Sequence, residues 1–391
     1  MSQTKTDLCV ERPKPSESVQ TLPRSDTHAL RMEYVETARL KTLLTTSSCD
    51  FLGIVHHERS PGGSNGLGAC PTVCLDLPQF SGPPITEVWT STLPVTYHQA
   101  DGIHCAMNEE VLFGAIQMEE PPGTRLDIVT YNAYHRLLAQ ARALGYMHLL
   151  RVWNYFPHIN RESDGRERYQ QFCVGRHRAL AESLSDFPRS LPAATAVGTM
   201  SGPLNLHFLA AKQPGIHIEN PRQVHAYEYP SFYGPSSPSF ARATLRSSST
   251  GSHLLISGTA SVVGHRSVHI CEPYKQILEI IHNLNTLIGH TERLHRGTRG
   301  RWSSGAVFKI YIRQPEHFAT IRNLFEERLP SDAQVLYLQG EMSRRELLAE
   351  VEGLLSQEKF QDVSRIRLPT FNRFRKHSVS RHAKPNHIRI V

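Results

Sequence analysis

Residues 226–265 decide the fold, and they read AYEYPSFYGPSSPSFARATLRSSSTGSHLLISGTASVVGH. The apolar run 254–256 has the composition of a buried strand bounded by turn residues. Gly251 precedes the run and Gly258 follows it, at points where the chain can bend or let another group come close. Prolines and glycines upstream force an extended path. This stretch therefore predicts a buried strand that follows a long, punctuated loop.

The loop carries four aromatic side chains and ends at a cation, Arg242; the aromatics are Tyr229, Phe232, Tyr233 and Phe240. A guanidinium can hold a carboxylate through two parallel hydrogen bonds, so the pattern suits a small, flat, anionic ligand. The alternative is an aromatic-rich loop that packs on its own sheet, and composition alone favours this alternative.

The strings YGP..PSFARA and SGTASVVGH in this stretch resemble the chorismatase family, which hydrolyses or aromatises chorismate with release of pyruvate. They are also similar to a longer version of the GPY..A…SG pattern of the YjgF-like (reactive-intermediate deaminase) fold, to which chorismatases are related. Weaker matches extend the resemblance over roughly residues 35–353.

Composition indicates a globular protein: the chain has 391 residues, of which 39% are hydrophobic and 20% charged. It contains no apolar run of the ~20 residues that span a bilayer and no apolar signal core near its start, so we expect a cytoplasmic protein without a membrane partner. Seven scattered cysteines indicate reduced thiols. Residues 361–391 carry the whole net charge of +7, which says little about the substrate, and no specific nucleic-acid partner is expected.

The order strands, helix, strand, helix, strands occurs twice at a spacing of about 150 residues, with helices predicted over 127–143, 166–183, 273–289 and 315–328. This predicts an α+β fold of two tandem units, each a mixed sheet covered on one face by two helices. The resemblance makes these units YjgF-like (chorismate-mutase-like). Since that fold trimerises through its sheets, we expect a pseudo-trimeric monomer or a small homo-oligomer.

The predicted divisions are a disordered segment 1–33, a degenerate N-terminal unit 34–220, a catalytic C-terminal unit 221–358 and a basic tail 359–391.

The segment LLAEVE, residues 347–352, offers an acid. Ala349 and Val351 flank Glu350. In an ideal strand these two residues point to one face, while Glu350 and Glu352 point to the other. Burial beside apolar neighbours would raise the pKa of Glu350, but an exposed edge strand with two solvated glutamates is the alternative. The segment resembles the chorismatase pattern ending in LLVEIE, whose first glutamate is catalytic. The resemblance thus implies that Glu350 is the general acid and base that protonates the enolpyruvyl methylene.

Two positions bear on the product through the same resemblance. Ser343 lies where the family has a small apolar residue in hydrolases and a cysteine in hydroxybenzoate-forming enzymes, and serine matches neither. Gly258 occupies approximately the other position associated with product choice, and glycine there favours hydroxybenzoate.

For the two carboxylates of chorismate we predict Arg242 first and Arg344 second, with phenolic hydrogen bonds from Tyr233 and Tyr229. Tyr155 and Arg176, in RVWNYFPHIN and RYQQFCVGRHRA, resemble family segments and are expected to reach the pocket from the first half. A surface position is the alternative for Arg344 and Arg176. Lys309, between Phe308 and Ile310, is expected to face solvent and is a weak candidate. No metal or nucleotide motif occurs, and the family reaction needs no cofactor.

The sequence thus predicts a chorismatase that acts on chorismate as its small-molecule substrate, releases pyruvate and forms 3- or 4-hydroxybenzoate. Three alternatives remain open: a hydrolase that stops at a dihydroxy-cyclohexadiene carboxylate, an imine deaminase, and a non-enzymatic protein whose basic tail contacts nucleic acid or an anionic membrane.

Overall fold

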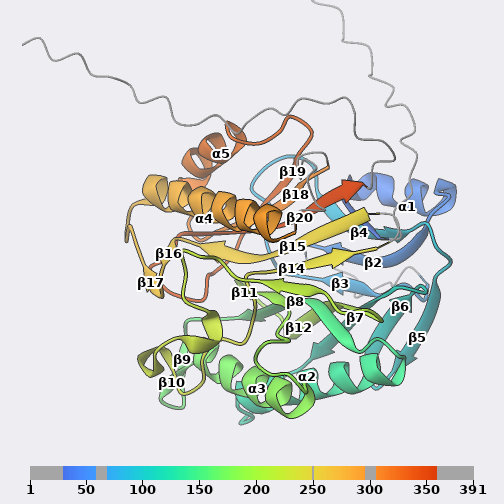
Figure 1. Ribbon diagram of the computed structural model, residues 1–391, viewed down its shortest axis with the longest axis horizontal. Coiled ribbons are helices and arrows are strands. Elements are labelled where there is room, and N and C mark those ends of the chain that lie inside the picture. Colours follow the sequence, from blue (N-terminus) through green and yellow to red (C-terminus); the bar gives the residue numbers. More distant parts are fainter. Residues whose placement is uncertain (1–29, 59–67, 249–250, 296–304, 359–391) are drawn as a thin grey trace, which may run out of the picture.

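The computed structural model describes residues 30–58, 68–248, 251–295 and 305–358 (Figure 1). Within these ranges the strands form two six-stranded sheets, one four-stranded sheet and two short two-stranded ribbons. The helices of the described ranges include none that is both long enough and apolar enough to cross a membrane.

The first six-stranded sheet spans residues 96–211. Its elements in chain order are β5 (Thr96–Ala100), β6 (Ile103–Met107), β7 (Val111–Met118), α2 (Leu126–Ala143), β8 (His148–Pro157), α3 (Arg168–Ser183), β11 (Ala193–Thr199) and β12 (Leu204–Ala211), with the ribbon β9 (Glu162–Ser163) and β10 (Arg166–Glu167) before α3. The spatial order is β11-β8-β12-β7-β6-β5, and β11 and β8 run parallel.

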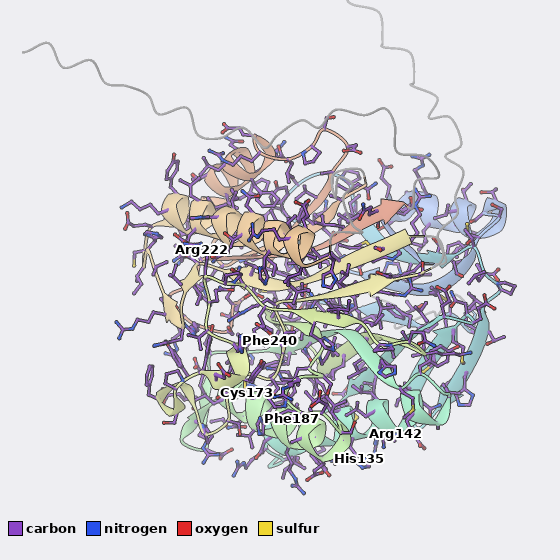
Figure 2. The ribbon with its side chains drawn as sticks, in the orientation of Figure 1. His135, Arg142, Cys173, Phe187, Arg222 and Phe240 are labelled. Carbon is purple, nitrogen blue, oxygen red and sulfur yellow. The ribbon has the colours of Figure 1, made fainter. Side chains whose placement is uncertain are left out.

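Helices α2 and α3 pack side by side on one face of this sheet. The buried residues of α2 recur at helical spacing, as in Val129, Ala133 and Leu137, and they meet apolar residues of the strands such as Phe208. His135 and Arg142 lie on the outer side of α2 (Figure 2). An amphipathic helix of this kind must cover a sheet, as the sequence predicted.

The second six-stranded sheet repeats the same plan. Its elements are β13 (Ile216–Ile218), β14 (Ala243–Ser247), β15 (Gly251–Ala260), α4 (Pro273–Leu294), β18 (Val307–Ile312), α5 (Phe318–Glu326), β19 (Gln334–Gln339) and β20 (Ala349–Glu358). The spatial order is β13-β14-β15-β20-β18-β19, and β18 and β19 run parallel. Both sheets thus have the chain order of three strands, helix, strand, helix and two strands. The predicted α+β class, with two tandem units of a mixed sheet and two helices, is confirmed.

Short elements complete the second unit. The loop between β13 and β14 holds two 3-10 turns, η1 (Ala226–Glu228) and η2 (Ser231–Tyr233), and a third, η4 (Pro315–His317), precedes α5. The ribbon β16 (Val262–Val263) and β17 (Arg266–Ser267) leads from β15 toward α4.

A third, smaller sheet was not predicted. It contains β1 (Arg31–Glu36), α1 (Thr37–Thr46), β2 (Asp50–His56), β3 (Thr72–Cys74) and β4 (Ile85–Ser91), in the order β1-β4-β2-β3. Helix α1 is not among the predicted helices, because it buries little more than Leu40 and lacks a wide apolar stripe.

The inner faces of the three sheets pack together in one central core. Trp89 of β4, Trp153 of β8, Leu255 of β15 and Tyr311 of β18 all belong to it. The two helix pairs lie on opposite outer sides of the molecule, with the sheets between them (Figure 1). The active-site candidates therefore lie where sheets meet rather than under a helix layer.

The ordered chain departs from the predicted divisions in two places. Leu30 is buried and β1 begins at Arg31, so the chain is ordered before the predicted limit at residue 33. Strand β13 pairs with β14 and so belongs with the second sheet, although it falls inside the predicted unit 34–220. The segments 1–29 and 359–391, for which we predicted disorder and a basic tail, lie outside the described residues.

Candidate active site

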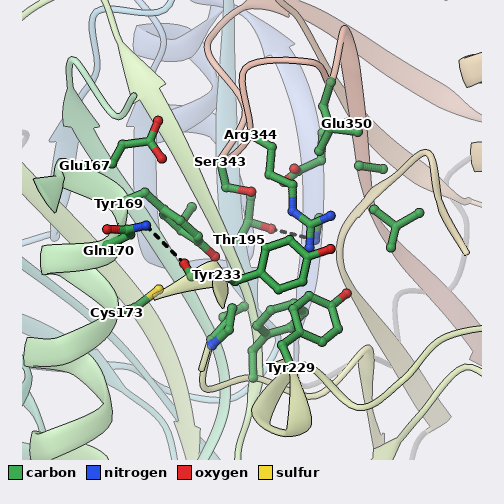
Figure 3. Close-up of a pocket in the computed structure, with 18 of the residues that line it drawn as sticks. Glu167, Tyr169, Gln170, Cys173, Thr195, Tyr229, Tyr233, Ser343, Arg344 and Glu350 are labelled. Atoms are coloured by element: carbon green, nitrogen blue, oxygen red, sulfur yellow. Dashed lines mark hydrogen bonds between the residues drawn. The ribbon is translucent and has the colours of Figure 1, made fainter. Parts of the chain in front are cut away.

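A cavity of about 310 Å³ lies between the two large units. Helix α3 and strand β11 form its wall on the side of the first unit, and the β13–β14 loop, β15 and residues 343–350 form the other side (Figure 3). Isolated backbone bridges join Ala193 to Ala241 and Gly198 to Glu341 across this boundary. The site therefore depends on the packing of one unit against the other.

Eight of the nine predicted site residues line this cavity: Arg176, Tyr229, Tyr233, Arg242, Gly258, Ser343, Arg344 and Glu350. Tyr155 does not line it. Its side chain is fully buried in the central core, and its hydroxyl lies 2.7 Å from the hydroxyl of Tyr311. The sequence placed Tyr155 on the correct strand, but the face that carries it points into the core.

Glu350 lies on β20, and its alternation with apolar neighbours is the predicted one. Ala349 and Val351 pack in the core beneath α4 and α5, while Glu350 faces the cavity and is 6% exposed. Burial first, and then the neighbouring charge of Glu352, raise the pKa of Glu350 to about 8, against the opposing effect of Arg151, Arg242 and Arg313. Among the described residues none makes a hydrogen bond or ion pair with this carboxyl. The raised pKa favours the protonated form of Glu350 at neutral pH.

Gly258 forms the cavity wall against that carboxyl. Strand β15 has a register shift between Ile256 and Thr259, which brings the backbone at Gly258 close to β20. The N–H of Gly258 donates a 2.9 Å hydrogen bond to Oγ1 of Thr195. This bond ties the wall beside Glu350 to strand β11 of the first unit.

Arg242 is held in place by bonds to the loop that it follows. Its Nη2 donates to the hydroxyl of Tyr229 and to the carbonyl of Val224, each at 2.9 Å. On its other side, Nε lies 3.9 Å from Oε2 of Glu219. Burial raises the pKa of Glu219 to about 7, although the charge of Arg242 acts to lower it. Because the Tyr229 hydroxyl accepts from Arg242, its own proton remains for a ligand.

Arg344 approaches Tyr229 from the other side. Its guanidinium lies 5.4 Å from the ring centre of Tyr229 and 4.3 Å from that of Tyr233, and Nη1 donates to the carbonyl of His265 at 3.0 Å. Tyr233 donates its hydroxyl to the same carbonyl at 2.7 Å. We had predicted a phenolic bond from Tyr233 to the ligand, but its hydroxyl is engaged, and its ring instead supports Arg344. Arg242 and Arg344 therefore flank Tyr229.

Arg176 supplies a third cation from α3. It is 2% exposed, so the alternative of a surface position is wrong. Its guanidinium lies 4.8 Å from the ring centre of Phe172 and 6.0 Å from that of Phe240. Cys173 and Thr195 also line the cavity and were not predicted (Figure 3). The spacing of Cys173 three residues before Arg176 on one helix was the available signal for the thiol, whereas no sequence feature marked Thr195.

Ser343 is half-buried at the cavity, and in the described ranges its hydroxyl has no hydrogen bond to a histidine or carboxylate that could activate it as a nucleophile.

Lys309, expected to face solvent, is 2% exposed, so that expectation was wrong. Groups of three or more His, Cys, Asp or Glu that could hold a metal ion do not occur in the described part of the chain.

A buried carboxyl, four arginines and aromatic walls line one small cavity, and this set of groups suits a small anionic substrate. Residues 87–210 match the family model described as chorismatase FkbO/Hyg5-like, N-terminal. The chain is 35% identical over 309 residues to a chorismatase of Streptomyces hygroscopicus, which covers 78% of this chain and 89% of that protein.

It is also 33% identical over 293 residues to a 3-hydroxybenzoate synthase of the same species, with 73% of this chain and 85% of that protein covered. A crystal structure of a chorismatase matches at a TM-score of 0.76 and 33% identity, covering 84% of this chain and 98% of the other. The chain belongs to the chorismatase family, as the motifs around Tyr233 and Gly258 predicted.

Proposed function

We propose that this enzyme cleaves the enolpyruvyl ether of chorismate, releases pyruvate and forms 3- or 4-hydroxybenzoate. The observation that carries the proposal is the buried carboxyl of Glu350, which faces a cavity where Arg242 and Arg344 flank Tyr229. Relatives named chorismatase and 3-hydroxybenzoate synthase support the choice of substrate.

Chorismate carries two carboxylates, one on the ring and one on the enolpyruvyl group. Arg242 and Arg344 bind one carboxylate each, and the Tyr229 hydroxyl donates a further hydrogen bond. Arg176 adds positive potential from the opposite wall. The cavity of about 310 Å³ is at the small end of the range for ligand pockets, which suits a compact substrate.

Catalysis begins when Glu350 transfers its proton to the methylene carbon of the enol ether. The double bond supplies the electron pair for the new C–H bond, and positive charge develops on the carbon next to the ether oxygen. The Glu350 carboxylate that remains stabilises this charge. In the route to 4-hydroxybenzoate the bond between the ring carbon and the ether oxygen then breaks, and its electron pair stays with the oxygen, which becomes the ketone of pyruvate. Glu350 takes the proton from the neighbouring hydroxyl-bearing ring carbon, whose C–H electron pair forms the last ring double bond. Pyruvate and hydroxybenzoate together contain all the atoms of chorismate, so the aromatising route consumes no net water.

The product depends on whether water attacks the positively charged carbon next to the ether oxygen. Gly258, through the family resemblance, favours the aromatic product. The alternative is the dihydroxylated diene acid, which contains the atoms of one added water, and the polar Ser343 at the cavity favours retention of a water there. Membership of the chorismatase family leaves the imine-deaminase and non-enzymatic alternatives without a supporting observation.

Three sheets from one chain already enclose the central core, which supports a monomeric enzyme. We place it in the cytoplasm, the compartment we expected from the sequence. Size-exclusion chromatography with light scattering tests the oligomeric state.

The deciding experiment is incubation of the purified enzyme with chorismate, with enzymatic detection of pyruvate and chromatography of the ring product. We expect stoichiometric pyruvate and hydroxybenzoate. Pyruvate together with a non-aromatic acid selects the hydrolase alternative. The absence of pyruvate contradicts the proposed function.

A further inference from the structure

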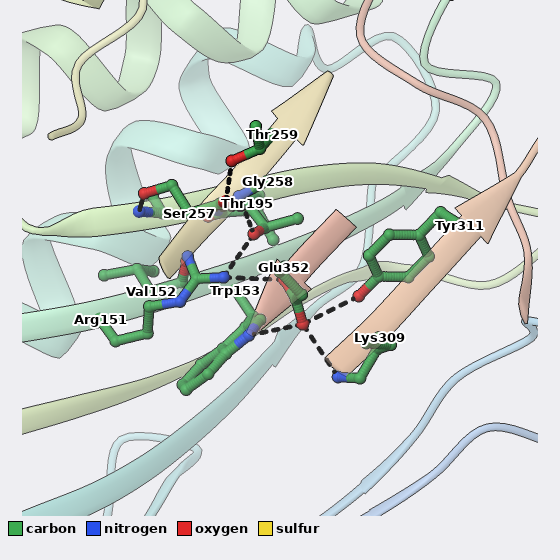
Figure 4. Close-up of polar contacts among 12 residues, drawn as sticks. Arg151, Val152, Trp153, Thr195, Ser257, Gly258, Thr259, Lys309, Tyr311 and Glu352 are labelled. Carbon is green, nitrogen blue, oxygen red and sulfur yellow. Dashed lines mark hydrogen bonds and ion pairs between the residues drawn. The ribbon is translucent and has the colours of Figure 1, made fainter. Parts of the chain in front are cut away.

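Four charged side chains form a cluster in the central core, and three of them, Arg151, Lys309 and Glu352, are labelled in Figure 4. The cluster comprises Glu87 of β4, Arg151 of β8, Lys309 of β18 and Glu352 of β20, and each side chain is at most 5% exposed. Nζ of Lys309 lies 2.6 Å from Glu87 and 3.1 Å from Glu352, and Arg151 lies 2.8 Å from Glu352. Two cations therefore match two anions, and the cluster as a whole is neutral.

Glu352 is bonded as an ionised carboxylate. Oε2 accepts from Arg151, while Oε1 accepts from Trp153 at 3.0 Å and from the Tyr311 hydroxyl at 3.2 Å, in addition to its contact with Lys309. Burial alone would raise the pKa of Glu352, but the charges of Lys309 and Arg151, together with side-chain hydrogen bonds from Thr195 and Lys309, hold it below its ordinary value. The cluster thus keeps a permanent negative charge inside the core.

That negative charge lies two residues from Glu350 on the same face of β20. The cations nearest to Glu350 are all bonded elsewhere. Arg242 binds Tyr229 and Val224, Arg151 binds Glu352, and Arg313 donates to main-chain carbonyls of residues 342–347. The charged groups that act most strongly on the pKa of Glu350 are Glu352, Arg151, Arg242 and Arg313, and Glu352 is the one anion among these four. Glu350 also faces a cavity that is lined by further charged side chains: Glu167, Arg176, Arg344, Arg345 and Glu346.

The cluster also helps to fix the wall opposite Glu350. Nη2 of Arg151 donates to Oγ1 of Thr195, which in turn accepts the N–H of Gly258. Arg151 therefore links Glu352 to the glycine against which the Glu350 carboxyl packs. Both the charge and the position of the proton donor depend on groups that the substrate does not touch.

We propose that Glu352 is a positioning residue for the reaction: its negative charge, which Lys309 and Arg151 maintain, keeps Glu350 in the protonated form that donates to the substrate. Glu352 does not line the cavity and so acts through Glu350. The proposal rests on the proposed function of Glu350 as proton donor.

A matched pair of variants tests it, because Glu352→Gln and Glu87→Gln each remove one negative charge from the same buried cluster at nearly constant volume. Only Glu352 is a neighbour of Glu350. In Glu352→Gln the lost anion and the remaining excess cation both lower the pKa of Glu350, so the alkaline limb of the profile of kcat against pH should move down by about one unit or more. At pH values well above 8 a shift of one unit is about a tenfold loss of activity, while activity at mildly acidic pH approaches that of the wild type.

Glu87→Gln should move the same limb by less than half as much. An unchanged limb in Glu352→Gln, or equal shifts in the two variants, would overturn the proposal. Thermal unfolding of both variants shows whether either substitution has destabilised the whole protein.

A second measurement does not require either variant to fold. Infrared spectra of wild-type enzyme labelled with ¹³C-glutamate should show a protonated carboxyl band at neutral pH that is absent from Glu350→Gln. Loss of this band with rising pH, without the appearance of a second protonated glutamate, supports an ionised Glu352 beside a neutral Glu350. A wild type without the band, or a band that survives in Glu350→Gln, overturns the inference. These outcomes are separate from pyruvate release by the wild type, which alone decides the proposed function.

Discussion

Gly258 and Glu350 are in such close contact that a side chain at position 258 would take the place of the carboxyl. A Cβ atom built on Gly258 would lie 1.9 Å from Oε1 of Glu350 and 3.2 Å from the methyl group of Thr195. The absence of a side chain on β15 thus determines where the proton donor on β20 can lie.

The first prediction concerns this contact. In Gly258→Ala the new methyl group must displace Glu350, and a misplacement of about 1 Å can lower a rate by roughly a hundredfold. We expect a fall in kcat of that order with little change in folding, measured by pyruvate release. Gly289→Ala is the matched control, because a Cβ on this α4 residue meets only Arg293, at 3.7 Å. A kcat within about twofold of the wild type in Gly258→Ala would contradict the contact.

The second prediction concerns the proton itself. Glu350→Gln keeps the size of the side chain but removes the acidic hydrogen, and general acid catalysis contributes about 10²- to 10⁴-fold. We expect turnover to fall by at least about a thousandfold, while circular dichroism and chorismate binding remain close to those of the wild type. Glu326→Gln, an exposed residue of α5 that pairs with Arg322, should retain full activity. Near-normal turnover in Glu350→Gln would exclude this residue as the acid.

The third prediction links Glu350 to stability. Its pKa rises from an ordinary 4.5 to about 8 on folding, so its stabilising contribution is fully present below about 4.5 and is lost as pH rises through about 8. Relative to Glu350→Gln, the wild type should lose stability over this interval, by a free energy of unfolding on the order of 4 kcal/mol. Urea unfolding of both proteins at several pH values measures the difference. A difference that does not vary with pH would show that Glu350 is not a neutral acid in the folded protein.

The fourth prediction concerns the binding of a substrate carboxylate by Arg242. Arg242→Ala removes a buried guanidinium, and hydrogen bonds to charged groups contribute about 1.5 to 3 kcal/mol. We therefore expect KM for chorismate to rise by roughly ten- to a hundredfold, with a smaller effect on kcat. Arg178→Ala removes an exposed arginine on α3 and should leave both constants unchanged. An unchanged KM in Arg242→Ala would assign the substrate carboxylates to other residues.

The sequence predicted the part of the site that one unit builds by itself. The alternation of Glu350 with Ala349 and Val351 and the motif ending at Arg242 are local features, and both placed their residues in the cavity. Thr195 could not be predicted to join them, since it reaches the cavity only because β11 packs against the other unit.

Lys309 shows why the central cluster was missed. Its alternation with Phe308 and Ile310 is typical of a strand with one face in solvent. In the structure both faces of β18 are covered: Phe308 and Ile310 pack in the core beneath α4 and α5, and Lys309 contacts Glu87 of the third sheet. Because nothing in residues 31–91 indicated that a third sheet covers this face, the sequence left Lys309 and Glu352 without partners.

The last prediction concerns Glu219, which lies 3.9 Å from Arg242 and whose pKa is raised by burial to about 7. Above this pH the ionised Glu219 competes with the substrate carboxylate for Arg242, whereas bound chorismate favours the neutral form. Substrate binding should therefore take up a proton, and KM should rise as pH increases from about 6 to about 8.5, by at most about tenfold per unit.

In Glu219→Gln the side chain is neutral throughout, so KM should stay near the low-pH value of the wild type. Glu228→Gln is the matched control: this residue is exposed and contacts His225 rather than Arg242, so its removal should leave the wild-type slope intact. Retention of the full slope in Glu219→Gln would show that the pH dependence arises from Glu350 or from the substrate. In that case the carboxyl behind Arg242 would serve only to hold the guanidinium in place.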